Sequence, residues 1–230
     1  MRILIDGLDL TGKTTLAKQL AEALRAEGAA VVHHRGVLAP RNPVATLLER
    51  CGISAPQHPT SALLNAAYLV ACALDRPLRG AAAWERDGIL IQESYVDRSL
   101  AYGIANGPWA AARLALRFPH LFTGFDLALY LHAPLEIRRG RLERRKEANV
   151  IDHRSVSGEE FQEAFTRALR TAGRRHRDVW FIDTSQAGTD RIVADVVRRA
   201  RECARPATGD PASGRLPAPR RTPRRSAVRS

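Results

Sequence analysis

One segment near the start of the chain constrains its fold more than any other. Gly7 and Gly12 are separated by four residues, and Lys13 and Thr14 follow directly. This is the spacing of a phosphate-binding loop, in which backbone N–H groups surround phosphate oxygens, the lysine reaches the outer phosphates and the hydroxyl faces Mg²⁺. The segment therefore predicts that a nucleoside triphosphate binds here.

The sequence on both sides of this loop has the pattern that such a loop requires. An apolar run ends at Asp6, and Leu16, Leu20 and Leu24 recur every fourth residue before Gly28. The pattern predicts a buried strand and then an amphipathic helix, whose N-terminus adds partial positive charge to the loop. The residues expected to contact the nucleotide are Gly7, Leu8, Asp9, Leu10, Thr11, Gly12, Lys13, Thr14 and Thr15.

The rest of the chain alternates short apolar runs with helical patterns. Further strands are expected at residues 29–33, 89–92, 127–131 and 179–183. Helices are expected at residues 44–51 and 61–76, around Trp84, from Pro134, and at residues 190–202. Ser157 and Glu160 predict a capping box for one more helix. This alternation predicts an α/β fold with a parallel sheet of about five strands and helices on both faces.

Length and charge divide the chain into a domain and a tail. The 230 residues are enough for one α/β domain but not for two. Residues 204–230 hold seven arginines and one aspartate, which accounts for +6 of the net charge of +12. We expect this tail to be disordered and residues 1–203 to form the domain. Since a charge run is usually only solvated, nucleic acid is not the expected partner.

Other features bear on metals, membranes and compartment. Cys51, Cys72 and Cys203 have no paired spacing, which indicates neither a disulfide framework nor a zinc site. His33 and His34 are adjacent on a predicted strand and point to opposite faces, so a shared metal ion is not expected. No uncharged apolar run approaches the length that spans a membrane. We therefore expect a protein of the reduced cytoplasm without a membrane partner.

Three further residues are candidates for the site. Glu93 ends a buried strand, where it can bind Mg²⁺ through water, orient an acceptor, or merely cap the next helix. Arg35 lies in the loop after the second predicted strand, and such loops carry ligands in parallel sheets. Tyr68 lies on an apolar helical stripe, where a core position and stacking on a base are both open interpretations.

Positive charge is concentrated in the helix that follows Pro134, at Arg138, Arg139, Arg141, Arg144, Arg145 and Lys146. Such density repels itself unless anions are present. We expect residues 138–154 to form a short lid that excludes water from the phosphates, with Arg139 and Arg144 stabilising the transition state. The loop and the lid together indicate phosphoryl transfer, in which the protein mainly positions two anionic groups, holds Mg²⁺ and neutralises charge.

Four segments also occur in the order found in one known family. They are the phosphate-binding loop with its acidic Asp9, residues 93–102 with the run Ser-Leu-Ala-Tyr, residues 125–131 with Pro134 and Glu136, and residues 181–184. On these segments, residues 1–202 resemble the thymidylate kinases, nucleoside monophosphate kinases that transfer the γ-phosphate of ATP to dTMP. The resemblance implies a three-layer P-loop kinase fold, ATP and Mg²⁺ as cofactors, and the homodimer that such kinases often form.

The resemblance also implies roles for residues. In the family, the acidic residue at the position of Asp9 contacts the sugar 3′-hydroxyl of the acceptor. Lys13, Glu93 and Arg98 are then expected to act in catalysis, and Thr14 and Glu93 to face the metal. The residues expected to bind the acceptor are Asp9, Arg35, Tyr68, Arg76, Glu93, Arg98 and Tyr102.

The chain departs from the family at the acceptor site. Glu93 and Ser94 stand where the family has Asp-Arg, and that arginine holds the acceptor's phosphate. Arg98 lies one helical turn later, so we expect it to supply the guanidinium. In the alternative register, Asp97 and Arg98 are the motif itself, but the strand would then extend beyond its apolar run. Cys72 stands where the family has a base-stacking aromatic residue.

Three hypotheses about function follow. The first is a thymidylate-kinase-like phosphotransferase that converts a nucleoside monophosphate to the diphosphate. The second keeps the fold but has an unphosphorylated nucleoside or another small hydroxylated molecule as acceptor, with Glu93 as general base. The third is a non-catalytic nucleotide-binding or RNA-associated protein in which the basic tail is the functional part.

Overall fold

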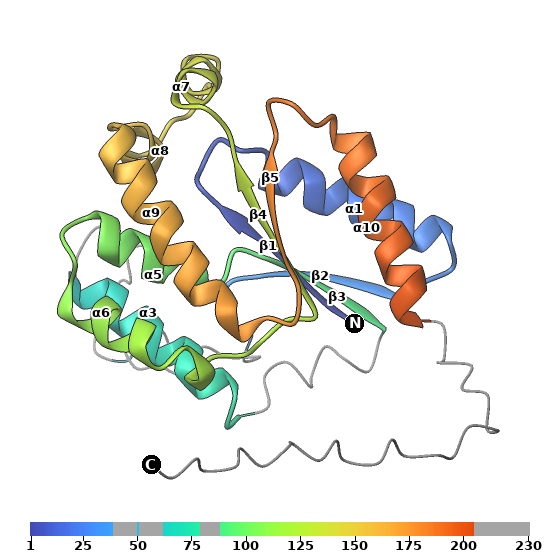
Figure 1. The fold of residues 1–230 in the computed structure, drawn as a ribbon, viewed down its shortest axis with the longest axis horizontal. Coiled ribbons are helices and arrows are strands. Elements are labelled where there is room, and N and C mark those ends of the chain that lie inside the picture. The colour runs from blue at the N-terminus through green and yellow to red at the C-terminus, as the bar shows by residue number, and fades with distance from the viewer. Residues whose placement is uncertain (39–49, 51–61, 79–87, 205–230) are drawn as a thin grey trace, which may run out of the picture.

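A five-stranded, all-parallel sheet runs through the centre of the molecule (Figure 1). The computed structural model describes residues 1–38, 50, 62–78 and 88–204. The strands are β1 (Arg2–Gly7), β2 (Val31–Arg35), β3 (Ile89–Glu93), β4 (Leu127–His132) and β5 (Val179–Asp183). Their order across the sheet is β2-β3-β1-β4-β5.

Helices cover both faces of this sheet. They are α1 (Lys13–Ala26), α3 (Ala62–Asp75), α5 (Val96–Ala105), α6 (Ala110–Arg117), α7 (Leu135–Glu143), α8 (Val150–Ser155), α9 (Glu159–Ala172) and α10 (Thr189–Ala204). Short 3₁₀ turns occupy Pro119–Leu121 and Gly173–Arg175. None of the described helices is long and apolar enough to cross a membrane.

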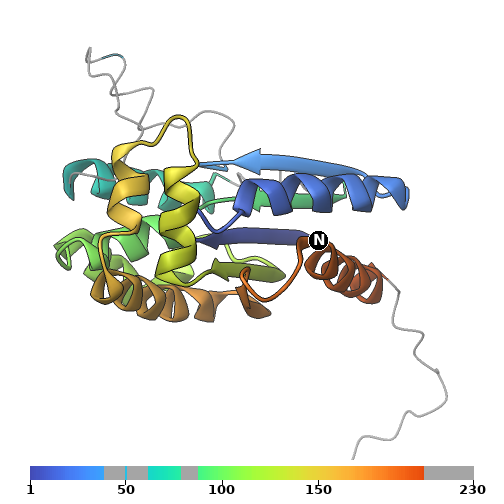
Figure 2. The same cartoon turned by 90° about the horizontal axis from the view of Figure 1, so that it is seen from above.

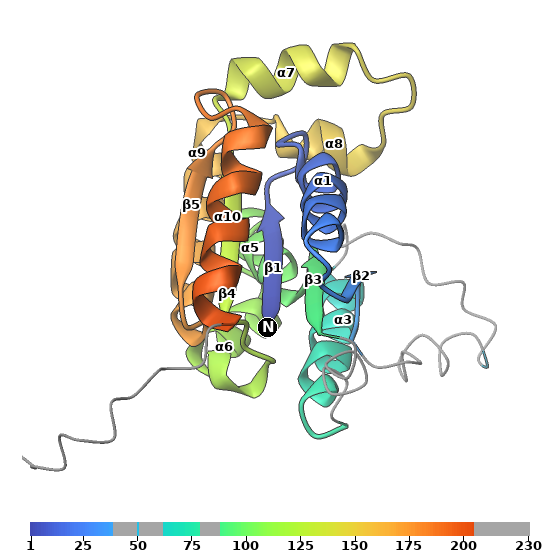
Figure 3. The same ribbon diagram turned by 90° about the vertical axis from the view of Figure 1, so that its right-hand side faces the viewer.

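The core is divided into two layers by the sheet. Ile3 and Ile5 pack with α1 and α10 on one face, whereas Leu4, Leu90 and Ala128 pack with α3, α5, α6 and α9 on the other. Figure 3 shows α1 and α10 in front of the sheet and α5 and α6 behind it. Alternate side chains of the same strand are buried on opposite faces, as expected for a parallel sheet covered on both sides. The predicted three-layer α/β fold with about five parallel strands is confirmed.

The strand order brings three strand ends to one place. β3 lies between β2 and β1, with Cα partners Arg35 and Glu93 in one pair of strands and Ile5 and Glu93 in the other. β4 pairs with the opposite side of β1. The strands that follow β1 are therefore added first on one side of it, as β2 and β3, and then on the other, as β4 and β5. Ligands of open α/β sheets bind at the carboxyl edge where the order reverses in this way. The loop after β1 lies at this edge.

The two helices of the expected lid lie over the same edge. α7 and α8 lie beyond the carboxyl ends of the strands, near the turn from β1 into α1 (Figures 2 and 3). The predicted helix from Pro134 is α7, and the predicted last strand and last helix are β5 and α10. The helix predicted at residues 61–76 is α3.

Two predicted details are wrong. β2 covers residues 31–35 and not 29–33, because the N–H of Ala29 still bonds to Leu24 O in the turn that ends α1. Ser157 and Glu160 form no capping box, since the N-cap of α9 is Gly158 and no side chain caps it. The capping box belongs instead to α8 and joins Asn149 and Asp152. Apart from residues 50 and 204, the helices expected at residues 44–51 and around Trp84, and the tail, lie outside the described residues.

Candidate functional site

The loop between β1 and α1 has the backbone of a phosphate cradle. Gly7 has φ 130°, and a Cβ there would lie 2.2 Å from Leu131 O on β4, so only glycine fits. Gly12, with φ 90°, is the N-cap of α1; no side chain caps the helix and its first turn holds no acidic residue. The first N–H groups of α1 are therefore directed at the loop without an anionic competitor, which suits a bound phosphate.

Lys13 is folded into this loop. Its Nζ donates to Gly7 O at 3.1 Å and to Leu8 O at 2.6 Å, and lies 3.4 Å from Asp9 Oδ1. Burial lowers the pKa of Lys13, while the neighbouring Asp9 carboxylate opposes that shift. The ammonium is held by carbonyl oxygens that phosphate oxygens can replace.

Thr14 and Glu93 meet beside the loop, as expected for a metal site. Thr14 Oγ1 donates to Glu93 Oε1 at 2.5 Å, and Glu93 is only 2% exposed. Hydroxyl and carboxylate oxygens are ligands that suit Mg²⁺, which usually takes one or two protein ligands together with substrate phosphates and water. In the described part of the chain, no group of three His, Cys, Asp or Glu residues forms a separate metal cluster. These two residues therefore fit a nucleotide-bound Mg²⁺.

Asp6 connects the loop to α5, a role that the sequence analysis missed. Its carboxylate accepts hydrogen bonds from the backbone N–H groups of Gly7 (2.8 Å), Tyr95 (3.1 Å) and Arg98 (3.2 Å). Burial raises the pKa of Asp6 to about 7, and the Asp97 carboxylate adds to the rise. The end of β1 thus caps the N-terminus of α5 and fixes that helix against the loop. A carboxylate at the end of a predicted strand was the available signal, as for Glu93.

A second cluster links the loop to α5 through side chains. Asp9 Oδ2 accepts from Arg98 Nη2 at 2.5 Å and from Tyr102 Oη at 2.6 Å. Burial alone would raise the pKa of Asp9, but Arg98 and then Lys13 lower it to well below its usual range. The structure thus brings Asp9, Arg98 and Tyr102 together beside Lys13. β3 ends at Glu93, and Asp97 and Arg98 lie within α5. This agrees with the preferred alignment to the family, in which Glu93 and Ser94 stand in place of Asp-Arg.

Two buried polar atoms near the start of α5 have no hydrogen-bond partner among the described residues. They are Ser94 Oγ and Arg98 Nε. Ser94 is also in the left-handed region, with φ 57°, in the turn that joins β3 to α5. Buried polar groups are almost always paired, so these two atoms are available to a ligand.

The other predicted acceptor residues, Arg35, Arg76 and Tyr68, form no hydrogen bond or ion pair with Asp9, Arg98 or Tyr102 in the described part of the chain. Arg76 is exposed and donates to the carbonyl of His120 in a 3₁₀ turn. Arg35 is exposed at the carboxyl end of β2. Tyr68 is half-buried against the core; burial raises the pKa of its hydroxyl well above the usual value, and the neighbouring, fully buried Cys72 adds to the rise.

The arginines of the expected lid differ in the contacts that they make in this structure, and the predicted roles of Arg139 and Arg144 in the transition state stay predictions. Arg138 is fully buried and donates to the carbonyls of Ala133 and Ser155 and to Gln162, so it holds the lid together. Arg139 is half exposed and pairs with Glu136 at 2.9 Å, and Arg144 is exposed at the end of α7.

Arg141 is the lid arginine that reaches the loop. Its Nη1 donates to Leu10 O at 2.8 Å and to Thr184 Oγ1 at 3.3 Å. Arg138 and Arg141 are three residues apart in α7, which places them on one side of that helix. Arg144 is also three residues from Arg141, so spacing alone could not have separated Arg141 from Arg144 in the sequence.

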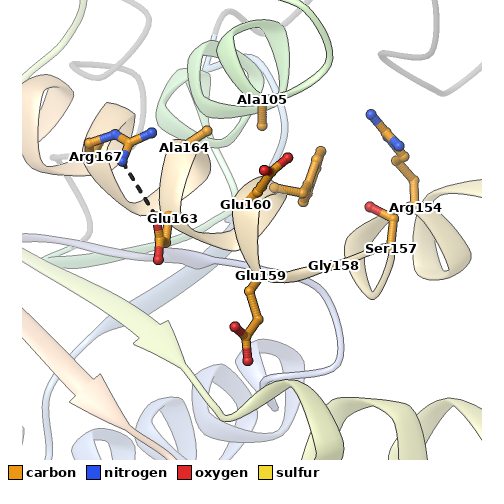
Figure 4. Close-up of a pocket in the computed structure, with 10 residues that line it drawn as sticks. Ala105, Arg154, Ser157, Gly158, Glu159, Glu160, Glu163, Ala164 and Arg167 are labelled. Atoms are coloured by element: carbon orange, nitrogen blue, oxygen red, sulfur yellow. Dashed lines mark ion pairs between the residues drawn. The ribbon is translucent and has the colours of Figure 1, made fainter.

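An open pocket of about 750 Å³ lies apart from the loop, between the C-terminal end of α5, α8 and the start of α9. Figure 4 shows Glu159, Glu160 and Glu163 of α9 together with Arg154 and Arg167 around it. Opposite charges alternate here, and Arg167 pairs with Glu163 at 3.6 Å. The pocket holds none of the residues of the phosphate cradle.

No protein-family model matches the chain, and no curated protein matches it. The resemblance to thymidylate kinases therefore stays a prediction from the motifs in the sequence. What the structure adds is independent of it, namely the sheet order, the cradle and the contacts around Lys13, Thr14 and Asp9.

Proposed function

We propose that this protein is an ATP-dependent phosphotransferase of the thymidylate kinase type. It transfers the γ-phosphate of ATP to a nucleoside monophosphate, with dTMP as the first candidate, and yields the diphosphate. The observation that supports this most is the convergence of Lys13, the Thr14–Glu93 pair and the Asp9–Arg98 pair around one loop. As part of the same proposal, the protein works in the cytoplasm as a homodimer.

The donor side of the reaction uses the loop and α1. The backbone N–H groups of residues 8–15 would surround the phosphates, and Lys13 would exchange Gly7 O and Leu8 O for phosphate oxygens. Thr14 and Glu93 would hold Mg²⁺, which when bound would neutralise the charge that develops on the phosphate oxygens. Arg141 already contacts Leu10 O in the loop and can close the lid over the nucleotide.

The acceptor side uses the start of α5. A phosphate oxygen of the acceptor forms the new bond to the γ-phosphorus, and the bond from that phosphorus to the bridging oxygen of ADP breaks. No proton has to leave a phosphate acceptor, so this route needs positioning and positive charge more than a base. Arg98 supplies the charge, and Ser94 Oγ is a further free hydrogen-bonding group.

The test is an ADP-coupled assay over a panel of nucleosides and nucleoside monophosphates. We expect turnover with dTMP and a loss of about 100- to 1,000-fold in kcat for Lys13→Ala, the size found when one transition-state donor is removed. Lys18→Ala, on the exposed face of the same helix, is the matched control and should retain activity. If no acceptor consumes ATP while ATP binding depends on Lys13, the protein is not a nucleotide kinase.

A second candidate, a neutral acceptor, is supported by one contact. Arg98 Nη2 lies 2.5 Å from Asp9 Oδ2, so the charge that would hold an acceptor phosphate is already compensated within the protein. Glu93 would then act as general base toward a hydroxyl group. Loss of dTMP turnover in Arg98→Ala favours the phosphorylated acceptor, whereas turnover of thymidine equal to that of dTMP favours the neutral one.

Removal of the basic tail tests the non-catalytic hypothesis. A chain that ends after Glu202 should keep its phosphotransferase activity if the domain alone is the enzyme. If the tail is the functional part, the same truncation should remove a salt-sensitive binding to RNA.

A further inference from the structure

Two adjacent histidines on β2 reach different neighbours on β3. His33 Nε2 lies 3.2 Å from Glu93 Oε2, and His34 Nδ1 lies 2.9 Å from Gln92 Oε1. In the register of this pair of strands, His33 is opposite Ile91, so its ring reaches diagonally to the residue two positions further along β3. Of these two contacts, the one made by His33 is with a residue of the candidate metal site.

Glu93 has its two oxygens occupied by two different side chains. Oε1 accepts from Thr14 Oγ1 of α1, and Oε2 faces Nε2 of His33 on the outer side. A glutamate has three rotatable side-chain bonds, so the contact with Thr14 alone leaves the plane of the carboxylate free to turn. The imidazole on the second oxygen fixes that plane.

Burial makes this second contact important. Glu93 is 3% exposed in its side chain, so bulk water does not solvate Oε2 in place of a protein donor. The side chain of His33 is 25% exposed, and thus forms the partly open outer wall of the site. A buried carboxylate oxygen without a donor carries a desolvation cost and tends to seek another partner.

We propose that His33 is a positioning residue of the metal site, which donates from Nε2 to Glu93 Oε2 and thereby holds Oε1 beside Thr14 for Mg²⁺. The proposal rests on the proposed function only in taking Thr14 and Glu93 as the metal-holding residues. His33 itself contacts neither phosphate nor acceptor. Hydrogen bonds to metal-ligating carboxylates orient them, and their loss typically lowers metal affinity about 10- to 100-fold.

The test measures metal binding without turnover. The protein is saturated with a non-hydrolysable ATP analogue, and the affinity for Mn²⁺ is followed by electron paramagnetic resonance. We expect His33→Ala to weaken Mn²⁺ binding about 10- to 100-fold. We expect His33→Gln, whose amide N–H can still donate to Oε2, to recover most of that loss. Affinity for the analogue in the presence of a metal chelator should be the same in all variants.

His34→Ala is the matched control, because it removes the same side chain from the next position of the same strand. It should leave Mn²⁺ affinity unchanged. Unchanged affinity in His33→Ala, or equal losses in both alanine variants together with a lower midpoint of urea unfolding, would overturn the proposal and reduce His33 to a structural residue. Because the readout needs no acceptor, a protein that binds Mn²⁺ with nucleotide but phosphorylates nothing would overturn the proposed function alone.

Discussion

Two buried carboxylates at neighbouring strand ends, Asp6 of β1 and Glu93 of β3, differ in what they bind. Asp6 accepts backbone N–H groups, and Glu93 accepts a hydroxyl group and faces an imidazole. The sequence predicted Glu93 as a site residue and gave Asp6 no role beyond ending a strand. Besides the adjacent Gly7, the donors to Asp6 are the N–H groups of Tyr95 and Arg98, far along the chain, and no local pattern encodes those two contacts. A carboxylate at the end of a predicted strand can therefore be expected to lie at the sheet edge, but the sequence does not tell which group it will bind.

The raised pKa of Asp6 predicts a pH dependence of stability. Burial raises this pKa from 3.8 to about 7 and Asp97 adds to the rise, whereas Lys13 and the N–H groups of Tyr95 and Gly7 lower it. Between about pH 4 and 7 the folded state keeps a proton that the unfolded state has released, so the free energy of unfolding should fall as pH rises. The slope from this group is at most about 1.4 kcal/mol per pH unit.

Asp6→Asn should lack this component. Urea unfolding of both proteins from about pH 4 to pH 8 isolates it, because the other titrating groups are common to the two chains. The variant also leaves one N–H donor at the strand end without an acceptor, which should cost about 1–3 kcal/mol at every pH. Identical pH slopes in the two proteins would contradict the raised pKa.

Among the elements, α5 unites the site because both of its faces are anchored. Asp6 caps its N-terminus, Arg98 and Tyr102 bind Asp9, and Asp97 on the other side accepts from Arg175 and from Tyr130. The sequence predicted every strand and most helices of the described residues, since hydrophobic periodicity is local. It did not predict the partners of Asp97, which come from β4 and from the turn before β5.

The Asp97–Arg175 pair predicts a large loss of stability when it is broken. Both side chains are buried, at 0% and 4% exposed. Burial would raise the pKa of Asp97, but Arg175 and then His176 lower it to well below its usual range. Arg175→Ala removes the main partner of a buried charge and should lower the free energy of unfolding by about 3–5 kcal/mol.

The control for this prediction is a surface pair of the same chemistry. Arg167 and Glu163 on α9 are 72% and 70% exposed, so Arg167→Ala should cost less than about 1 kcal/mol. Both variants are measured by urea unfolding at neutral pH. Similar losses in the two variants would mean that Asp97 finds other compensation, for example from His176, whose Nε2 lies 3.3 Å away.

At the scale of the whole molecule, the expected lid, residues 138–154, makes contacts both within itself and with the rest of the protein. Arg138 binds it to α9 through Gln162, Arg145 pairs with Asp152 within it, and Arg141 joins it to the loop at Leu10. The sequence predicted a lid at residues 138–154 from its density of arginine. Density does not tell which of these side chains reaches the loop, because that depends on how α7 packs in the folded protein.

Arg141 therefore predicts how the lid and the nucleotide are coupled. Its guanidinium bridges Leu10 O in the loop and Thr184 between β5 and α10. When the lid closes, the guanidinium is expected to exchange these protein acceptors for oxygens of the nucleotide. Arg141→Ala then removes one charge-assisted hydrogen-bonding group and should raise KM for ATP about tenfold or more.

Arg139→Ala is the control for this prediction. It removes only the exposed pair with Glu136 and should leave KM for ATP unchanged. Steady-state kinetics with ATP as the varied substrate measure both. Tighter ATP binding in Arg141→Ala would show instead that the arginine holds the lid against the loop and must be displaced before nucleotide can enter.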